Sequence, residues 1–176
     1  MTYVASVTDD MVFTAIRAWV IASAAVSDCI QGDGNRASIP AGGTDFVIMT
    51  PLTRSRLSLN ETSHPTTSTE TSTSSFDYAI QLDCYGPNAG DIVSVLDTSW
   101  YSNRTFDALK TQYVFPLYSE HPRFAPMVNG EQQYENRWIL VIHIQFKPSI
   151  TDSQQSASSV TITPTGIINV DVKYPG

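Results

Sequence analysis

The fold class of this chain follows first from residues 76–85, which read FDYAIQLDCY. Apolar or aromatic side chains stand at every second position, and mostly polar residues lie between them. This period of two predicts a β-strand with one buried face and one solvent-exposed face. Gly86-Pro87-Asn88 then ends the strand. Residues 137–147 alternate in a similar way, and apolar residues also occur on the second face, so we expect a central strand there.

Apolar residues at three- and four-residue spacing predict helices on either side of this strand. The first helix is expected over Asp9–Val26, with Thr8 as its N-cap. Further helices are expected over Ala89–Tyr101 and, more briefly, over Thr105–Gln112. Because the first helix is apolar nearly all round, it should be covered on more than one side, by the rest of the fold or by a neighbouring subunit.

Other strands are shorter or less regular. Residues 28–31 are expected to form a short strand, and residues 46–49 a strand buried on both faces. Pro51 either ends this second strand or places it at a sheet edge. A last strand is expected over residues 167–173, after a polar linker at 149–160.

Two stretches have no clear apolar period. Residues 62–75 contain 11 Ser or Thr among 14 residues, which predicts either a long β-arm with two wet faces or a mobile loop. Residues 117–129 are expected to form a loop with nearby prolines. The Asn129-Gly130 pair after it is typical of a hairpin turn.

The order of these elements predicts the fold class. Helix, strands, helix and strands follow one another, which favours an α+β fold with a mainly antiparallel sheet and two to three helices packed on one face. The chain of 176 residues suits a single domain, residues 1–176, that carries the Ser/Thr-rich arm or loop.

The composition of the chain limits the classes of function that it can have. Charged residues make up 15% of the chain, against about 25% in an ordinary soluble domain. The net charge of −7 is the wrong sign for a protein that holds nucleic acid by neutralising phosphates. The N-terminus has no basic segment before its apolar run, so we expect no signal peptide and synthesis in a reducing cytoplasm. Cys29 and Cys84 are then expected to be free, buried thiols.

Catalytic and metal-binding patterns are missing from the sequence. His64, His121 and His143 show no zinc-site spacing, and no nucleophile-elbow motif is present. We therefore predict no catalytic residues, no metal and no cofactor. His143 is expected to be a strand residue with a hydrogen-bond partner. A small cytoplasmic enzyme using Asp77, Asp83 or His143 remains a rival, as does a ligand-binding module with a deep apolar pocket.

Three segments together resemble a known family. Residues 31–57 include Gly34-Asn35-Arg36 and the run DFVIMTPL, and residues 81–87 read QLDCYGP and lead into a helix through Gly90-Asp91. Residues 122–138 contain NGEQQY followed by Arg-Trp and are the most specific of the three. In this order the segments resemble the neck or tail-terminator proteins of tailed bacteriophages, over most of residues 5–148.

The resemblance implies a structural virion protein without catalysis or cofactor. Such proteins form a ring, typically a hexamer, at the top of the tail, where the ring ends the tail tube and meets the head-completion proteins. DNA passes through the lumen without specific binding. The implied partners are further copies of the chain, the tail tube protein and the head-completion or adaptor proteins. The implied location is the virion, with synthesis in the host cytoplasm and no membrane contact. An adaptor, a stopper or a tail-tube-like subunit remains an alternative.

Several polar residues in or near these segments are candidates for subunit or neck contacts. These candidates are Arg54, Arg56, Glu131, Tyr134 and Arg137. For Arg137, a simple intrachain ion pair with Glu131 or Glu135 stays open as an alternative.

Overall fold

The computed structural model describes residues 4–32, 40, 43–66, 68–128 and 134–153. Three helices lie in these ranges: α1 (Asp9–Ser23), α2 (Ala89–Trp100) and α3 (Asn103–Lys110). The strands described are β1 (Cys29–Gln31), β2 (Phe46–Arg56), β3 (Glu61–Thr66), β4 (Thr69–Thr73), β5 (Phe76–Tyr85), β6 (Val114–Ser119), β7 (Arg123–Phe124), β8 (Met127–Val128), β9 (Tyr134–Glu135), β10 (Arg137–Phe146) and β11 (Ser149–Ser153).

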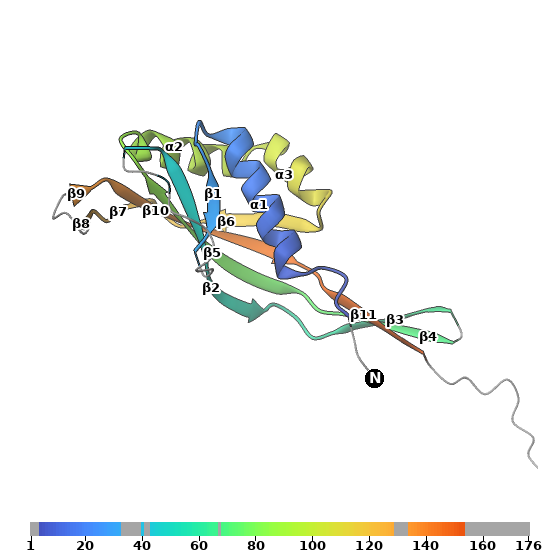
Figure 1. The fold of residues 1–176 in the computed structure, drawn as a ribbon. Helices are drawn as coiled ribbons and strands as arrows, with labels where there is room; N and C mark the ends of the chain where they lie inside the picture. The colour runs from blue at the N-terminus through green and yellow to red at the C-terminus, as the bar shows by residue number, and fades with distance from the viewer. Residues whose placement is uncertain (1–3, 33–39, 41–42, 67, 129–133, 154–176) are drawn as a thin grey trace, which may run out of the picture.

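The main sheet has the order β1-β2-β5-β10-β6, and β7 also pairs with β10. Only the β1–β2 pairing is parallel, and the others are antiparallel. All three helices cover one face of this sheet (Figure 1). The predicted α+β class, with a mainly antiparallel sheet and helices on one face, is therefore confirmed.

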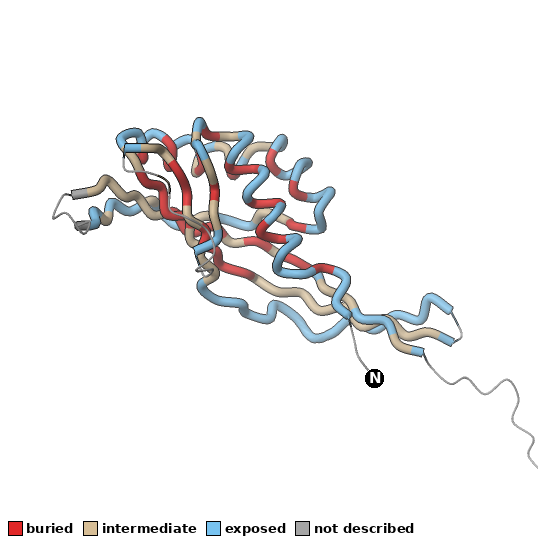
Figure 2. The backbone as a smooth tube through the Cα atoms, viewed as in Figure 1, coloured by how far each residue is buried: buried red, intermediate tan, exposed pale blue. Residues whose placement is uncertain are grey.

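The core forms where β5 and β10 face the helices. The two strands pair so that Ile80 stands opposite Ile142 and Leu82 opposite Leu140, and all four side chains are fully buried. Figure 2 shows buried residues concentrated where the helices lie over the sheet. The prediction of a solvent-exposed second face on β5 is wrong, because Ala79 and Asp83 are each only 4% exposed and Asp77 and Gln81 are partly buried. Neighbouring side chains on β2 and β10 cover that face, so the period of two does not separate buried from wet positions there.

Helix α1 begins where the sequence indicates. The Thr8 side chain accepts a hydrogen bond from the backbone N–H of Met11, which confirms the predicted N-cap. The helix ends at Ser23, three residues before the predicted end. Ala24 is already extended, and the N–H of Ser27 then donates to the carbonyl of Asp45, so the chain turns toward the sheet.

Helices α2 and α3 lie close to their predicted positions. The Ser102 hydroxyl caps α3 by accepting from the backbone N–H of Thr105, a signal that the sequence-based prediction missed. The Trp100 ring of α2 meets the Trp19 ring of α1 edge to face, with 4.9 Å between ring centroids. This contact joins the helices over the sheet. Among the described residues, no helix has the length and apolar character needed to cross a membrane.

Strand β2 is longer than predicted because it continues through Pro51 to Arg56. Its parallel neighbour β1 pairs only as far as Met49, so the segment that contains Pro51 has no described neighbour on that side. The missing N–H of Pro51 therefore costs no ladder bond. Of the two predicted alternatives, the sheet edge is the correct one, and a bulge follows between Pro51 and Thr53.

The Ser/Thr-rich stretch is an arm, not a loop. Strands β3 and β4 form a hairpin, and β11 pairs with β4 to give the order β11-β4-β3. We call this three-stranded sheet the arm; it projects from the body on the side away from β8 and β9 (Figure 1). The predicted linker at 149–160 is wrong for residues 149–153, because an extended backbone with hydroxyl side chains pairs readily with a similar strand.

The predicted loop at 117–129 is also wrong in part, because β6, β7 and β8 occupy much of it. Pro116 does not prevent pairing because β6 is an edge strand. The Asn129-Gly130 turn lies outside the described residues, although β8 and β9 on either side of it pair antiparallel. The predicted strand at 167–173 also lies outside the described residues.

Candidate assembly surfaces

The face of the main sheet opposite the helices holds a buried ion pair. The carboxylate of Asp83 accepts hydrogen bonds from Nε and Nη2 of Arg137 at 3.1 and 2.9 Å, and from the amide of Gln81 at 2.9 Å. The Asp83 side chain is 6% exposed and that of Arg137 is 25% exposed. Arg137 thus forms an intrachain ion pair with Asp83, a partner that the sequence-based prediction did not name. Cross-strand pairing sets this choice, which spacing along the chain does not reveal.

A second polar cluster on the same sheet face contains His143. Its Nδ1 lies 2.9 Å from a carboxylate oxygen of Asp77, and its ring stacks on Tyr118 with 4.1 Å between centroids. Its Nε2 is buried without a hydrogen bond and lies 3.7 Å from the carboxylate of Glu120. The predicted hydrogen-bond partner for His143 is confirmed.

The second ring nitrogen of His143 bears on the rival enzyme hypothesis. An Asp–His pair can orient an imidazole for base catalysis, in which the free ring nitrogen takes a proton from a side-chain nucleophile, from water or from a substrate. Here Nε2 of His143 has no hydroxyl or thiol of the described residues within hydrogen-bond distance. Within the described part of the chain, no three His, Cys, Asp or Glu side chains are grouped so that they could hold a metal ion.

Two of the predicted contact residues lie where the arm meets the body. Arg54 forms an ion pair with Asp9, and its guanidinium lies 4.4 Å from the centroid of the Tyr78 ring. Arg56 lies over the Phe76 ring at 5.1 Å and donates to the Ser74 hydroxyl at 3.2 Å. Both arginines therefore hold the root of the arm in place. Their role in contacts with other subunits stays a prediction.

The other candidates are less well defined. Glu131 lies outside the described residues. Tyr134 belongs to β9, and the structure does not describe its side chain. A contact role for either residue is therefore still a prediction.

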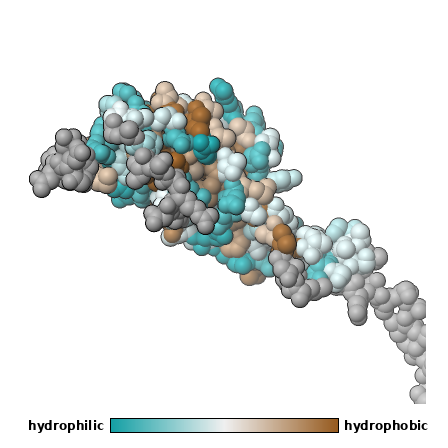
Figure 3. Space-filling view, in the orientation of Figure 1, coloured by the Kyte–Doolittle hydropathy of each residue, from teal (hydrophilic) through white to brown (hydrophobic). Residues whose placement is uncertain are grey.

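The arm itself has no core of its own. None of the residues in β3, β4 or β11 is buried. Besides the backbone ladder, hydroxyls bridge the strands, for example Thr71 to Thr151 at 3.0 Å and Thr66 to Thr69 at 2.6 Å. In the space-filling view the arm is pale, whereas apolar residues reach the surface over the helices (Figure 3). The arm therefore offers other molecules backbone edges and hydroxyls, not an apolar face.

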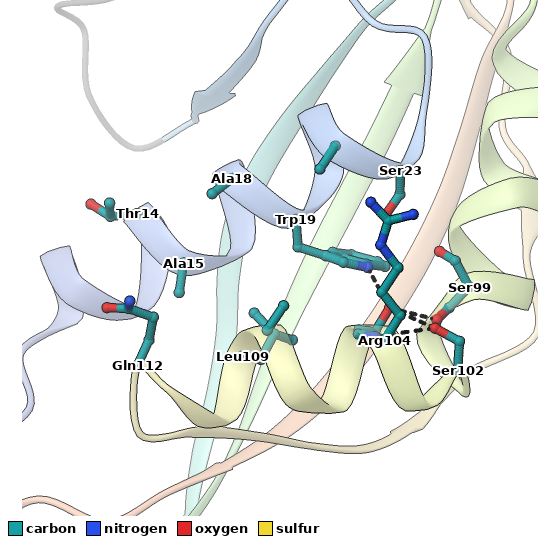
Figure 4. Close-up of a pocket in the computed structure, with 13 residues that line it drawn as sticks. Thr14, Ala15, Ala18, Trp19, Ser23, Ser99, Ser102, Arg104, Leu109 and Gln112 are labelled. Carbon is teal, nitrogen blue, oxygen red and sulfur yellow. Dashed lines mark hydrogen bonds between the residues drawn. The ribbon is translucent and has the colours of Figure 1, made fainter.

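A groove of about 540 Å³ runs between α1 and α3. Alanines of both helices and the Trp19 ring line it, and Arg104 extends from α3 toward Ser23 at its rim (Figure 4). The indole N–H of Trp19 donates to Thr105 at 3.0 Å, and Thr105 donates to the carbonyl of Ser99 at 2.7 Å. The sequence indicated that α1 needs a second cover, and this groove is one of the places where α1 lies open.

The two thiols have a structural role. Cys29 and Cys84 are free and buried, as predicted, and burial raises the pKa of each to about 12. Both pair with Val47 from opposite sides, so two strand spacings, about 9.6 Å, separate their backbones. That separation is too large for a disulfide.

Comparison with known proteins identifies the family. No curated protein matches the chain. The family model of phage neck terminator proteins matches residues 10–169, a range that includes all three segments on which the resemblance rested. A structural role in the virion neck, in association with other neck and tail proteins, follows from this match. The chain belongs to the phage neck terminator protein family.

Proposed function

We propose that this neck protein assembles into a closed ring, most simply a hexamer, at the top of the phage tail. The ring terminates the tail tube, joins it to the head-completion proteins and lets DNA pass through its lumen. Residues 1–176 act as a single domain in this role. The proposal assigns the chain no catalytic step and no cofactor, and it places synthesis in the host cytoplasm.

The observation that carries the proposal is the projecting arm. A sheet of three strands normally needs an apolar face packed against something else to be stable on its own. This one buries no side chain, and no strand of the described residues pairs with the outer edge of β3 or of β11, where Ser149 is hydrogen-bonded to Ser6. Unpaired strand edges bind a neighbouring chain through backbone hydrogen bonds. An arm of this kind supports assembly with further copies.

Contacts at the arm root fit this role. Arg54 and Arg56 fix the direction in which the arm leaves the body, through Asp9 and through the Tyr78 and Phe76 rings. We propose that these arginines, with Glu131, Tyr134 and Arg137, lie at or near contacts with other subunits.

The charge of the chain suits a channel for DNA. Each copy carries −7, so six copies carry about −42 around the lumen. Such a field repels the phosphate backbone and lets a duplex slide through without being held. The protein should therefore show no salt-sensitive, submicromolar affinity for duplex DNA in a filter-binding or anisotropy assay.

The test of the proposal is the oligomeric state with and without the arm. Wild-type protein should form rings at high concentration by native mass spectrometry and by electron microscopy, which also gives the symmetry. A variant in which a two-residue turn replaces residues 61–73 should keep its melting temperature within a few degrees, since the deleted strands bury no residue, but should lose ring formation.

Two results would contradict the proposal. One is a wild-type chain that stays monomeric at every concentration and is missing from the neck in a density map of the particle. The other is an arm-deleted variant that assembles as well as the wild type. A ring whose symmetry differs from sixfold would instead favour one of the other neck components.

A further inference from the structure

The groove between α1 and α3 combines an apolar floor with one cation. Three exposed alanines, Ala18, Ala22 and Ala108, supply small apolar surfaces, and the nearly buried Trp19 and Leu109 lie beneath them. Arg104 is the only charged residue that lines the groove among the described residues. It is exposed, and no carboxylate of the described residues forms an ion pair with it. An occupant of this groove should therefore be an apolar side chain with a carboxylate close by.

Such a combination occurs at the root of the arm, between β2 and β3. Leu57 is 50% exposed, and Leu59, at 89%, is the most exposed large hydrophobic residue of the described chain. Glu61 follows two residues later, is exposed, and also lacks an ion-pair partner among the described residues. We call residues 57–61 the leucine strip. Two leucines and a carboxylate thus lie within five residues of exposed chain.

The groove and the leucine strip are different surfaces of one chain. The groove lies in the helical layer, and the strip lies where the arm leaves the body (Figure 1). When a surface binds a different surface on an identical copy, the contact is head-to-tail, and repeating it closes a ring if the rotation between copies allows. A subunit that carries both the leucine strip and the groove can bind one neighbour through each surface, as the subunits of a ring do.

We propose that the leucine strip of one copy docks in the α1–α3 groove of the next copy. Leu59 packs on the exposed alanines of the groove, above Trp19 and Leu109, and Glu61 pairs with Arg104. This contact covers the exposed groove side of α1 and buries the two exposed leucines at the root of the arm. The inference rests on the proposed ring and names the two surfaces that join its subunits.

The test exchanges the two charges. Glu61→Arg and Arg104→Glu, each alone, should shift the concentration for half-assembly upward by at least about tenfold, since each puts like charges together. The double variant E61R/R104E should restore assembly. Leu59→Asp should weaken it at least as much, because it places a charge against the apolar floor. Native mass spectrometry over a dilution series measures all of these, and circular dichroism checks that each variant is folded.

Mixing the two single variants gives a sharper result. In an alternating ring, the charge-reversed groove of R104E meets the charge-reversed leucine strip of E61R. At the next contact, the unchanged groove of E61R meets the unchanged strip of R104E, so opposite charges face each other at every joint. Equimolar E61R and R104E should therefore assemble together into even-numbered rings, although neither does so alone. A change confined within one chain cannot produce this rescue.

Arg123→Glu is the matched control. Arg123 is also exposed and also lacks an ion-pair partner in the described part of the chain, but it lies on β7, away from the groove. The same charge reversal at this position should leave assembly unchanged.

The possible failures are distinct. If the wild type never oligomerises, the ring itself is refuted before any variant is compared. If the wild type forms rings and R104E and L59D form them equally well, only the docking is refuted. Docking is also refuted if these variants form normal rings but fail to join particles, because the groove then binds a different neck protein.

Discussion

Replacing Arg137 by methionine should destabilise the fold strongly, because Arg137 neutralises a buried carboxylate. Asp83 is only 4% exposed, and Arg137 supplies two of its hydrogen bonds. After the substitution, the amide of Gln81 remains as its one side-chain donor among the described residues. Methionine keeps most of the length of the arginine side chain, so the loss reflects charge more than volume.

The expected loss follows from the burial of the pair. Removing one partner of a buried ion pair costs about 3–5 kcal/mol. Because a quarter of the Arg137 side chain is exposed, water can partly replace it, and we expect the lower end, about 3 kcal/mol. For a chain of this size, that corresponds to a fall in melting temperature of about 6–12 °C.

The assay is a double-mutant cycle with thermal and urea unfolding followed by circular dichroism. Asp83→Asn combined with Arg137→Met removes both charges, so the double variant should regain at least about 1 kcal/mol relative to R137M. Arg17→Met is the control, since its ion pair with Asp28 is largely exposed, with side chains 52% and 39% accessible. That change should cost no more than about 1 kcal/mol.

The reasoning is refuted if R137M costs no more than R17M, or if the double variant is as unstable as R137M. The same variant also tests the contact role of Arg137. If R137M still forms rings below its melting temperature, the residue acts within the chain and not between subunits.

Three further predictions concern the core and the turns. Both buried thiols stay protonated in the folded state up to about pH 12 but ionise from about pH 9 when the chain is unfolded. The free energy of unfolding should therefore fall between these pH values. At pH 10 the two thiols together should lower it by about 3 kcal/mol relative to neutral pH. Urea titrations should show a flatter pH dependence for the C29A/C84A variant, and equal slopes would contradict the assignment. Gly86 has a φ of 109°, and a Cβ at this position would lie 2.8 Å from the Cα of Asp45. Gly86→Ala should therefore lower the free energy of unfolding by about 2 kcal/mol, measured by thermal unfolding. A neutral effect would show that the turn can relax. Thr105→Val should cost about 1–3 kcal/mol because the buried indole N–H of Trp19 loses its acceptor, whereas Thr105→Ser should retain most of the stability, and equal losses in the two variants would point to packing instead.

Much of the architecture could be predicted from local patterns. The alternation in residues 76–85 gives β5 the bounds that the structure shows, and the Thr8 cap fixes the start of α1. Both signals depend on neighbouring residues, because strand alternation and helix capping are short-range geometry. The three quoted segments also sufficed to predict the family, which the family model confirms over residues 10–169.

Other features depend on which distant segments meet. Whether Pro51 ends β2 or lies at a sheet edge depends on the length of β1, and the partner of Arg137 depends on the register between β5 and β10. The pairing of β11 with β4 joins residues about 80 positions apart, which a local reading as polar linker could not detect.

The sequence by itself thus determined the three helices, the central strands, the fold class and the family, because hydrophobic period, capping and motif order are properties of neighbouring residues. Only the tertiary structure decided that the hydroxyl-rich stretch projects as a paired arm, that Asp83 holds Arg137, and that α1 and α3 leave a groove open. Each of these depends on contacts between segments far apart in the chain, whose register is set by packing of the whole core.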